Sequence, residues 1–223
     1  MNRVVIFLML SVYAFATYAQ DYDEEVLPSD RNHWTVTVAY DESIPGDWKL
    51  AGGSFKMFKP GGGVSLGVDY MLFFNNKLFF EPGVRFFIDN YRYDNITIGA
   101  GTPEEPSITC DPPVMKTGMR LPLMLGYKFD VFKRGSLFLA TGLEPIIGFT
   151  ARTSLDEHLK DIFTENMYKT LMSRYDMACD IRAAIIIDHF RVDLTGALGL
   201  FDVIKTDAKM HEYRISIGLG YVF

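Results

Sequence analysis

Charged residues at every second position are the part of this sequence best suited to chemistry. They alternate with apolar residues, and successive side chains of a β-strand point to opposite faces, so each strand would turn its charges to one side. The charged residues with this parity are Asp69, Glu81, Arg85, Arg120, Lys128, Glu144, Asp180, Arg182, Arg191, Asp193, Glu212 and Arg214. Enclosed together, they would either line a gated pore or proton path or fill the interior as paired ions. Because an unpaired buried charge is very costly, we expect a polar network of ion pairs. The partners expected for Glu81 and Glu144 are Arg85, Arg120 and Arg214.

Histidine is the other residue type that could act in catalysis, together with a serine or an acidic residue. The four histidines are His33, His158, His189 and His211. No serine–histidine–acid set has recognisable spacing. His158 and His211 each lie next to a glutamate in sequence, but neighbouring side chains on a strand or helix point in different directions. We therefore expect no catalytic residues and no enzyme activity.

No pattern for a cofactor or a metal is present. The glycines of residues 52–63 lack the lysine and hydroxyl residue of a phosphate-binding loop, and no zinc or calcium spacing occurs. Cys110 and Cys179 are the only cysteines, which are too few for a disulfide framework or a zinc site. They could form one disulfide bond, and the sequence leaves this open because the distance between them is unknown.

The composition excludes several classes of protein. The chain has 223 residues, of which 48% are hydrophobic and 14% aromatic, with a net charge of −6. Such a chain is too apolar for disorder, and its sequence pI of about 5.2 argues against binding to nucleic acid. Only one long apolar run is present, so the chain is not a bundle of membrane-spanning helices.

That apolar run lies at the N-terminus and predicts a secretory signal peptide. Arg3 precedes an uncharged stretch over residues 4–16, and small residues lead up to a cut between Ala19 and Gln20. A membrane anchor is the alternative, although the run is short for one. We expect residues 1–19 to be the signal peptide, 20–32 a polar periplasmic lead-in, and 33–223 one domain.

Period-2 alternation of apolar and small or polar residues dominates this domain and predicts strands. Eight such segments can be traced, at residues 33–40, 64–74, 77–89, 119–129, 137–149, 177–187, 190–200 and 211–223. The connections at 75–76, 133–135 and 188–189 are tight, whereas those at 41–63, 90–116 and 150–175 are long. Short turns that alternate with long loops are typical of an outer-membrane barrel.

The two faces of these strands favour a membrane barrel over a soluble sandwich or a lipocalin-like barrel. The polar face is rich in glycine, and the apolar face has aromatic residues at both margins, such as Trp34 with Tyr40 and Tyr213 with Tyr221. Aromatic residues at both edges suit the two lipid–water interfaces. Lipid cannot satisfy free backbone groups, so the sheet must close on itself. The predicted fold is an all-β, eight-stranded antiparallel transmembrane β-barrel with one amphipathic helix in an extracellular loop.

That helix is predicted over residues 155–172, in the third long loop. Ser154 and Glu157 match a capping box. The apolar residues that follow at helical spacing are Leu155, Leu159, Ile162, Phe163, Met167 and Leu171. This apolar face would pack on the barrel mouth, on the lipid interface or on a partner protein.

The chain resembles the PorT-like outer-membrane β-barrel family of Gram-negative bacteria, a relative in fold of the OmpA transmembrane domain. The resemblance covers roughly residues 32–223 and depends on four stretches, at 78–83 (LFFEPG), 119–125 (MRLPLML), 137–145 (LFLATGLEP) and 217–223 (IGLGYVF). It implies an outer-membrane location. It also implies that Leu219, Tyr221 and Phe223 form the signal read by the barrel-assembly machinery, which an exposed strand edge could engage by β-augmentation.

These observations together predict a non-enzymatic, plugged barrel that displays its loops at the cell surface. The family name comes from a protein required for secretion, so the resemblance implies a role as an accessory to secretion or to envelope integrity. Its expected partners are outer-membrane lipid, the assembly machinery, and a secretion-system or envelope protein. A narrow passive channel and a lipid-A-modifying barrel enzyme are the alternatives.

Overall fold

The computed structural model of the chain describes residues 31–50, 53–94, 96–98, 108–132, 134–153, 166–205 and 209–223. For residues 50, 96–98, 108–110 and 132 it describes the backbone alone. The predicted signal peptide at 1–19, its cleavage site between Ala19 and Gln20, and nearly all of the lead-in at 20–32 lie outside these residues.

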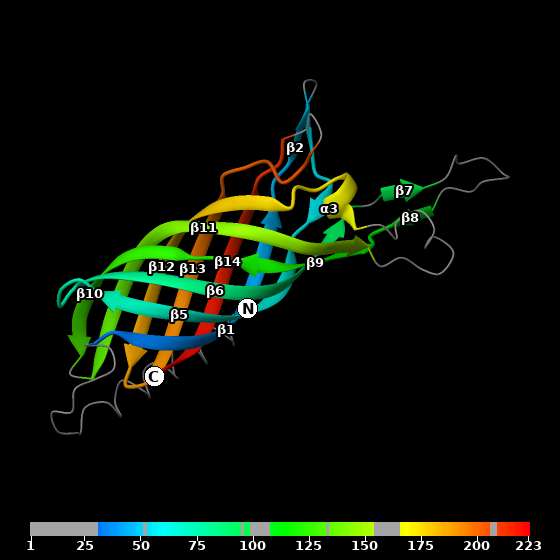
Figure 1. Cartoon of the computed structure of the whole chain (residues 1–223). Coiled ribbons are helices and arrows are strands. Elements are labelled where there is room, and N and C mark those ends of the chain that lie inside the picture. Colours follow the sequence, from blue (N-terminus) through cyan, green and yellow to red (C-terminus); the bar gives the residue numbers. More distant parts are fainter. Residues whose placement is uncertain are drawn as a thin grey trace, which may run out of the picture.

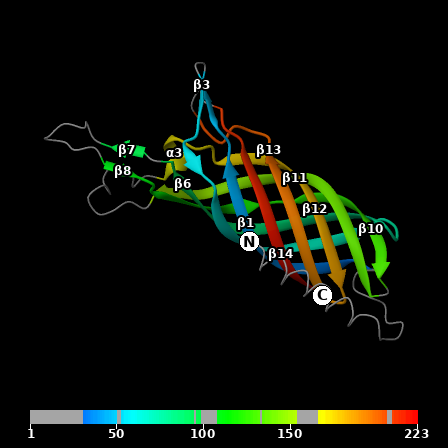
Figure 2. The ribbon, with the colours of Figure 1, turned by 180° about the vertical axis from the view of Figure 1, so that it is seen from behind.

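Antiparallel strands close into a barrel with a ring of eight strand paths (Figure 1). In ring order they are β1 (His33–Pro45), β5 (Gly61–Phe73), β6 (Leu78–Tyr93), β9 (Pro113–Arg120) continued by β10 (Leu123–Phe132), β11 (Gly135–Thr153), β12 (Tyr175–Ile187), β13 (Phe190–Gly199) and β14 (Glu212–Val222). The last strand pairs with the first, from Thr35 opposite Val222 to Pro45 opposite Glu212, and Figure 2 shows β14 beside β1. This closure leaves the ring of eight strand paths without a free edge, as the prediction of a barrel requires.

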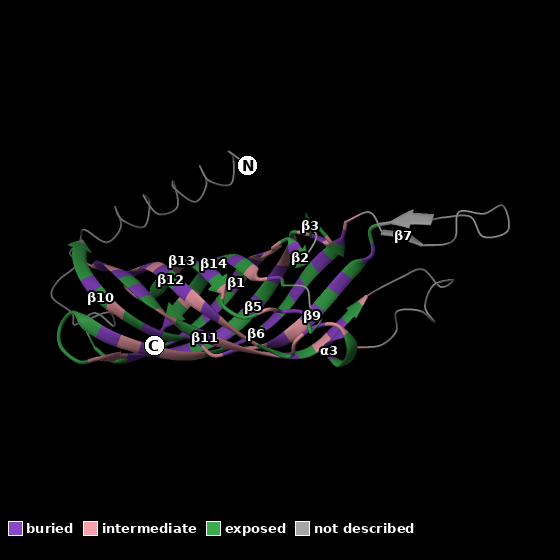
Figure 3. Cartoon of the chain, turned by 90° about the horizontal axis from the view of Figure 1, so that it is seen from above, coloured by how far each residue is buried: buried purple, intermediate pink, exposed green. Residues whose placement is uncertain are grey.

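Buried and exposed residues alternate along the strands (Figure 3). On β14, the outward Tyr213 and Ile217 are 42% exposed, whereas the inward Arg214 and Ser216 are buried. Across the barrel the large exposed side chains are apolar, whereas the inward ones are charged, hydroxylic or small residues together with apolar clusters at the two ends. A water-soluble domain would have the opposite arrangement, so the predicted direction of the two faces is confirmed.

Tight turns and long loops are separated at the two ends of the barrel, as predicted. The connections of β5 to β6, β10 to β11 and β12 to β13 lie at the same end as the C-terminus (Figure 1). Asp188, with a positive φ of 52°, makes the last of these turns. The other end carries the hairpin of β2 (Trp48–Leu50) and β3 (Gly53–Phe55), the strand β4 (Phe58–Lys59), the hairpin of β7 (Ile96–Ile98) and β8 (Ile108–Cys110), and the helix α3 (Met167–Thr170).

Several strands run further outward than predicted. β1 continues to Pro45 rather than Tyr40, β6 to Tyr93, and β11 to Thr153. Beyond the lipid, the outward face no longer needs apolar residues, so the alternation in hydrophobicity fades while backbone pairing continues. The loop ranges 41–63, 90–116 and 150–175 were therefore too wide.

The predicted fourth strand, 119–129, is wrong as a single segment. It begins earlier, at Pro113, and it is interrupted between Arg120 and Leu123. Pro122 has no N–H to donate to the ladder, and its carbonyl instead accepts from Gly83 N at 2.9 Å.

The predicted helix over 155–172 is corrected at Asn166. This residue has an extended backbone (φ −64°, ψ 110°) and forms the N-cap of the short helix α3, because its side chain accepts from Tyr168 N. Met167 is buried and Leu171 is partly buried against the same apolar cluster. The remaining members of the predicted apolar face, Leu155, Leu159, Ile162 and Phe163, lie outside the described residues, as does the predicted capping box at 154–157.

Candidate functional site: the charged interior of the barrel

The interior is filled by the charged residues that share the inward parity of their strands. Less than 7% of the surface of each of the following is exposed: Asp69, Glu81, Arg85, Arg120, Lys128, Glu144, Asp180, Arg182, Arg191, Asp193 and Arg214. Glu212 also points inward, with 14% of its side chain exposed. The structure therefore places the whole predicted set inside one barrel.

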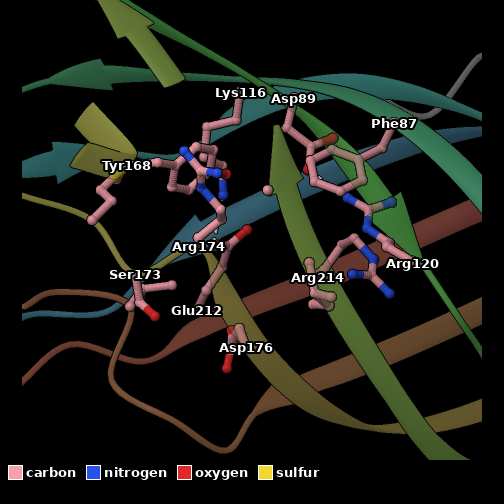
Figure 4. Close-up of a pocket in the computed structure, with 14 residues that line it drawn as sticks. Phe87, Asp89, Lys116, Arg120, Tyr168, Ser173, Arg174, Asp176, Glu212 and Arg214 are labelled. Carbon is pink, nitrogen blue, oxygen red and sulfur yellow. Dashed lines mark hydrogen bonds and ion pairs between the residues drawn. The ribbon is translucent and has the colours of Figure 1, made fainter. Parts of the chain in front are cut away.

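Arg120 of β9 forms the centre of the network. Its guanidinium group donates to Asp41 of β1 at 2.6 Å and to Asp89 of β6, and it lies 3.9 Å from Glu144 of β11. Its face stacks over the ring of Phe87, 4.1 Å from the ring centre (Figure 4). One cation thus connects carboxylates from three other strands and ties opposite parts of the wall together.

Glu144 also accepts from Arg214 of β14 at 2.6 Å, and the same guanidinium group lies 3.9 Å from Asp180 of β12. This pairing extends the network from Arg120 across to the far wall. The expectation that Glu144 meets Arg120 and Arg214 agrees with these distances.

Glu81 belongs to a second cluster deeper in the barrel, and its predicted partners are wrong. It accepts from Arg182 at 2.7 Å and lies 2.9 Å from Arg191. Parity assigns a residue to a face, but the tilt of the strands decides which residues share a level, so Glu81 of β6 faces β12 and β13. Arg85 instead pairs with Asp69, at 2.8 Å.

Nearer the outer end, Lys116 joins the network to the barrel mouth. Its ammonium group donates to Glu212 at 2.7 Å and to the hydroxyl of Tyr91, whose ring centre is 4.1 Å away. Figure 4 shows Glu212 below Tyr168 of α3, and Lys116 above it. These groups form the outermost polar level, directly under the loops.

An apolar cluster closes the interior at the end with the tight turns. Phe79, at 0% exposed, packs edge-on against Phe138 at 5.6 Å between ring centres, and against Phe73 at 5.9 Å. The other members are Met71, Met124, Ala140, Ala184, Ile186 and Val222. We call this set the inner seal. A small ion would have to displace it in order to pass, because an apolar constriction excludes hydrated charge.

A second apolar cluster, which we call the outer cap, covers the mouth. It consists of Trp48, Phe58, Tyr91, Tyr93, Val114, Ala151, Met167, Tyr168, Met172, Val203, Ile204 and Met210. Asn166 holds α3 in place, since its side chain accepts from Ala151 N at 2.9 Å and donates to Phe149 O at 3.0 Å. Burial in this cap raises the pKa of the Tyr168 hydroxyl above its ordinary value.

The space left between cap and network is small. A cavity of about 20 Å³, measured as space for the centres of water molecules, lies between Tyr168, Arg120 and Glu212. That volume suits about one water molecule. Among the residues that the structure describes, this cavity has room for water but not for a substrate.

Sequence reasoning missed Asp41, Asp89, Tyr91 and Lys116 as members of the network. Asp89 was the last residue of a predicted strand, and the other three fell in predicted loops. Their alternation with outward residues, as in Asp89, Tyr91 and Tyr93, was the signal that could have identified them.

The remaining predicted residues have defined places. Leu219, Tyr221 and Phe223 are 61%, 43% and 62% exposed on the outward face of the last strand. Cys179 on β12 is a free thiol, so the structure does not contain the Cys110–Cys179 disulfide bond that the sequence left open.

The described histidines lie apart. His33 is near the inner end, where its Nδ1 lies 2.8 Å from Arg31 O, and His189 stacks on Tyr221 in a tight turn. His211 lies 3.8 Å from Asp202 at the outer end. His158 is outside the described residues.

In the part of the chain that the structure describes, no three of histidine, cysteine, aspartate and glutamate gather as a metal site. No helix among these residues has the length and apolar character to cross a membrane.

No family model and no curated protein matches the sequence. Among solved structures, the chain is similar to OprG from Pseudomonas aeruginosa, with 11% identity over 87% of this chain and 97% of that chain and a TM-score of 0.46. Ail of Yersinia pestis, solved with the heparin analogue sucrose octasulfate, is 14% identical over 86% and 99% of the two chains, with a TM-score of 0.41. Neisserial surface protein A is 13% identical over 85% and 97%, also with a TM-score of 0.41. Because these TM-scores are below 0.5, the functional assignment depends on the chain's own geometry, and the PorT-like resemblance stays a prediction.

Proposed function

We propose that the chain is an outer-membrane β-barrel of a Gram-negative bacterium that serves as a sealed, non-enzymatic anchor and displays its long loops at the cell surface. The observation that carries this proposal is the charged layer enclosed between the inner seal and the outer cap.

The outward surface supports a position in the membrane. Between Tyr213 and Tyr221 the exposed side chains of β14 are Ile215, Ile217 and Leu219. Eight residues at about 3.3 Å each span about 26 Å, or about 20 Å in height at a strand tilt of about 40°. This is close to the height of an outer-membrane apolar layer, about 25 Å.

The interior supports an anchor rather than a pore. An eight-stranded barrel is only wide enough for its own side chains, and here these side chains are ion pairs with little space for water. Arg120, Arg182 and Arg214 each connect different strands, so an open pathway would require several buried pairs to separate. If the surface loops carry out the binding, the interior has only to stabilise the barrel.

The partners of this module follow from its surfaces. Lipid covers the apolar band, and the outward Leu219, Tyr221 and Phe223 suit recognition by the barrel-assembly machinery. The PorT-like resemblance adds a role as an accessory to protein secretion or envelope integrity, with the loops as the contact region.

A narrow passive channel is the second candidate, because the small cavity extends from below the cap into the charged layer. Conductance across planar lipid bilayers separates the two. The wild-type protein should give no reproducible steps, whereas steps that disappear in Arg120→Ala would support the channel and contradict the sealed anchor. Migration of unheated against heated protein in detergent gels should confirm that the inserted form is the folded barrel.

A further inference from the structure

We infer that the outward face of β6, β9 and β11, at the outer margin of the apolar band, binds the phosphorylated headgroup of an outer-leaflet glycolipid. This inference extends the proposed function, because it needs the barrel to stand in an outer membrane. The patch is formed by Arg92, Arg152, Met115, Thr117 and Thr150, and we call it the rim patch.

Strand register places the two arginines of the rim patch on either side of β9. Arg92 of β6 lies opposite Pro113 of β9, and Arg152 of β11 lies opposite Met115 of the same strand. Two strand spacings and a two-residue offset separate their Cα atoms by about 12 Å. Both side chains are exposed and long, so both can reach a group that sits above Met115, itself 45% exposed.

The exposed side chains in this region become more polar toward the outer end of the barrel, as a lipid does from its acyl chains to its headgroup. Ile88 and Phe149, 47% and 45% exposed, belong to the apolar band and would contact acyl chains. Ile88 lies opposite Thr117, and Thr117 lies opposite Thr150, so the outer edge of the apolar band also carries two hydroxyl groups, 2.8 Å apart, that suit the sugar and ester region. The arginines follow at the level expected for phosphate groups.

The arginines of the rim patch are available to a ligand. Neither has an ion pair within the part of the chain that the structure describes. Their neighbour Lys59, opposite Arg92, differs in this respect, since it lies 2.8 Å from Asp111 and 3.1 Å from Asp94. A guanidinium fork matches phosphate oxygens in bidentate fashion, which makes arginine well suited to such a headgroup.

The opposite wall lacks this arrangement. At the outer end of β1, the exposed Tyr40 donates from its hydroxyl to Glu42 at 2.7 Å, and the partners of these two residues on β14 are the exposed apolar residues Ile217 and Ile215. A carboxylate at this height would repel a phosphate. The charge difference between the two walls therefore directs an anionic headgroup to the rim patch.

Binding of lipid A to the intact folded protein, measured by native mass spectrometry in detergent, tests the inference. The probe is bisphosphorylated lipid A, compared with the same lipid after removal of its phosphates. The variants are Arg92→Gln with Arg152→Gln, and the lysine pair Arg92→Lys with Arg152→Lys. Lys209→Gln is the matched control, because it removes an exposed charge from the same end of the barrel but outside the patch.

The glutamine pair should bind lipid A at least about tenfold more weakly than the wild type, and the lysine pair should bind with intermediate strength. The control should bind like the wild type, and the dephosphorylated lipid should bind wild type as weakly as lipid A binds the glutamine pair. Unchanged binding by the glutamine pair, an equal loss in the control, or equal binding of both lipids would overturn the inference. Complete displacement of lipid A by an equal concentration of inorganic phosphate would also overturn it, since the site would then take free anions. The heat-dependent gel shift, recorded for every variant, separates these results from a failure of the barrel assignment itself.

Discussion

Arg120→Met should be among the most destabilising single substitutions in this barrel. The change keeps most of the side-chain volume but removes a cation that contacts Asp41 at 2.6 Å, Asp89, and Glu144 at 3.9 Å. Glu144 keeps Arg214 as a partner, whereas Asp41 loses its closest cation. Removing one partner from a buried ion pair typically costs about 3–5 kcal/mol, because the remaining charge is left without compensation.

Urea unfolding of the protein refolded into lipid vesicles, followed by tryptophan fluorescence and by the heat-dependent gel shift, measures this cost. We expect the free energy of unfolding to fall by about 3–5 kcal/mol. Asp41→Asn combined with Asp89→Asn should recover much of the loss in the Arg120→Met background, because the charges left behind are then neutral. The exposed Arg92→Met should cost about 0.5 kcal/mol or less.

A loss below about 1 kcal/mol for Arg120→Met would refute the reasoning, since it lies within the range of an exposed ion pair. The same conclusion would follow if the exposed Arg92→Met cost as much as Arg120→Met.

Three other predictions concern the inner seal, the outer cap and the outer loops. Phe79→Ala should lower the free energy of unfolding by about 3–5 kcal/mol, because it leaves a cavity among packed rings; chemical denaturation measures the loss, and a change below about 1 kcal/mol would contradict it. Asn166→Ala should cost about 1–2 kcal/mol through the lost helix cap, and hydrogen exchange should accelerate at α3 but remain slow in the barrel strands. The pKa of Lys59 should lie above its ordinary value of 10.5, because hydrogen bonds to Asp111 and then Asp94 favour the charged amine. Its ion pairs should therefore persist below pH 10.5 and be lost as the pH rises through the raised pKa; an NMR titration that shows no difference between wild type and an Asp111→Asn variant would count against this.

Within the predicted strands, the sequence alone was sufficient to predict which face the inward charges and the outward apolar residues take. A side-chain period of two is a local property of the strand, so it assigned Tyr213 and Ile217 outward and Arg214 inward without knowledge of any neighbour. The same local reasoning predicted closure of the sheet, because a lipid-facing sheet cannot leave backbone groups unpaired. Turn lengths predicted which end of the barrel would carry the loops.

Strand ends were predictable only within the membrane. Beyond the lipid, a strand keeps its hydrogen bonds but no longer needs apolar residues outside, so β1 and β6 continued through Asp41 and Tyr91 without the expected signal. The helix prediction had a related weakness, since its spacing could not reveal the extended backbone at Asn166.

Which charges meet was decided by tertiary structure. Strand tilt and stagger determine which residues of distant strands share a level, and neither quantity is contained in the order of residues along one strand. Glu81 therefore meets Arg182 and Arg191, about a hundred positions away in sequence, rather than the nearer Arg85. The alternation along each strand determines which charges point inward, and closure of the barrel determines which of them form ion pairs.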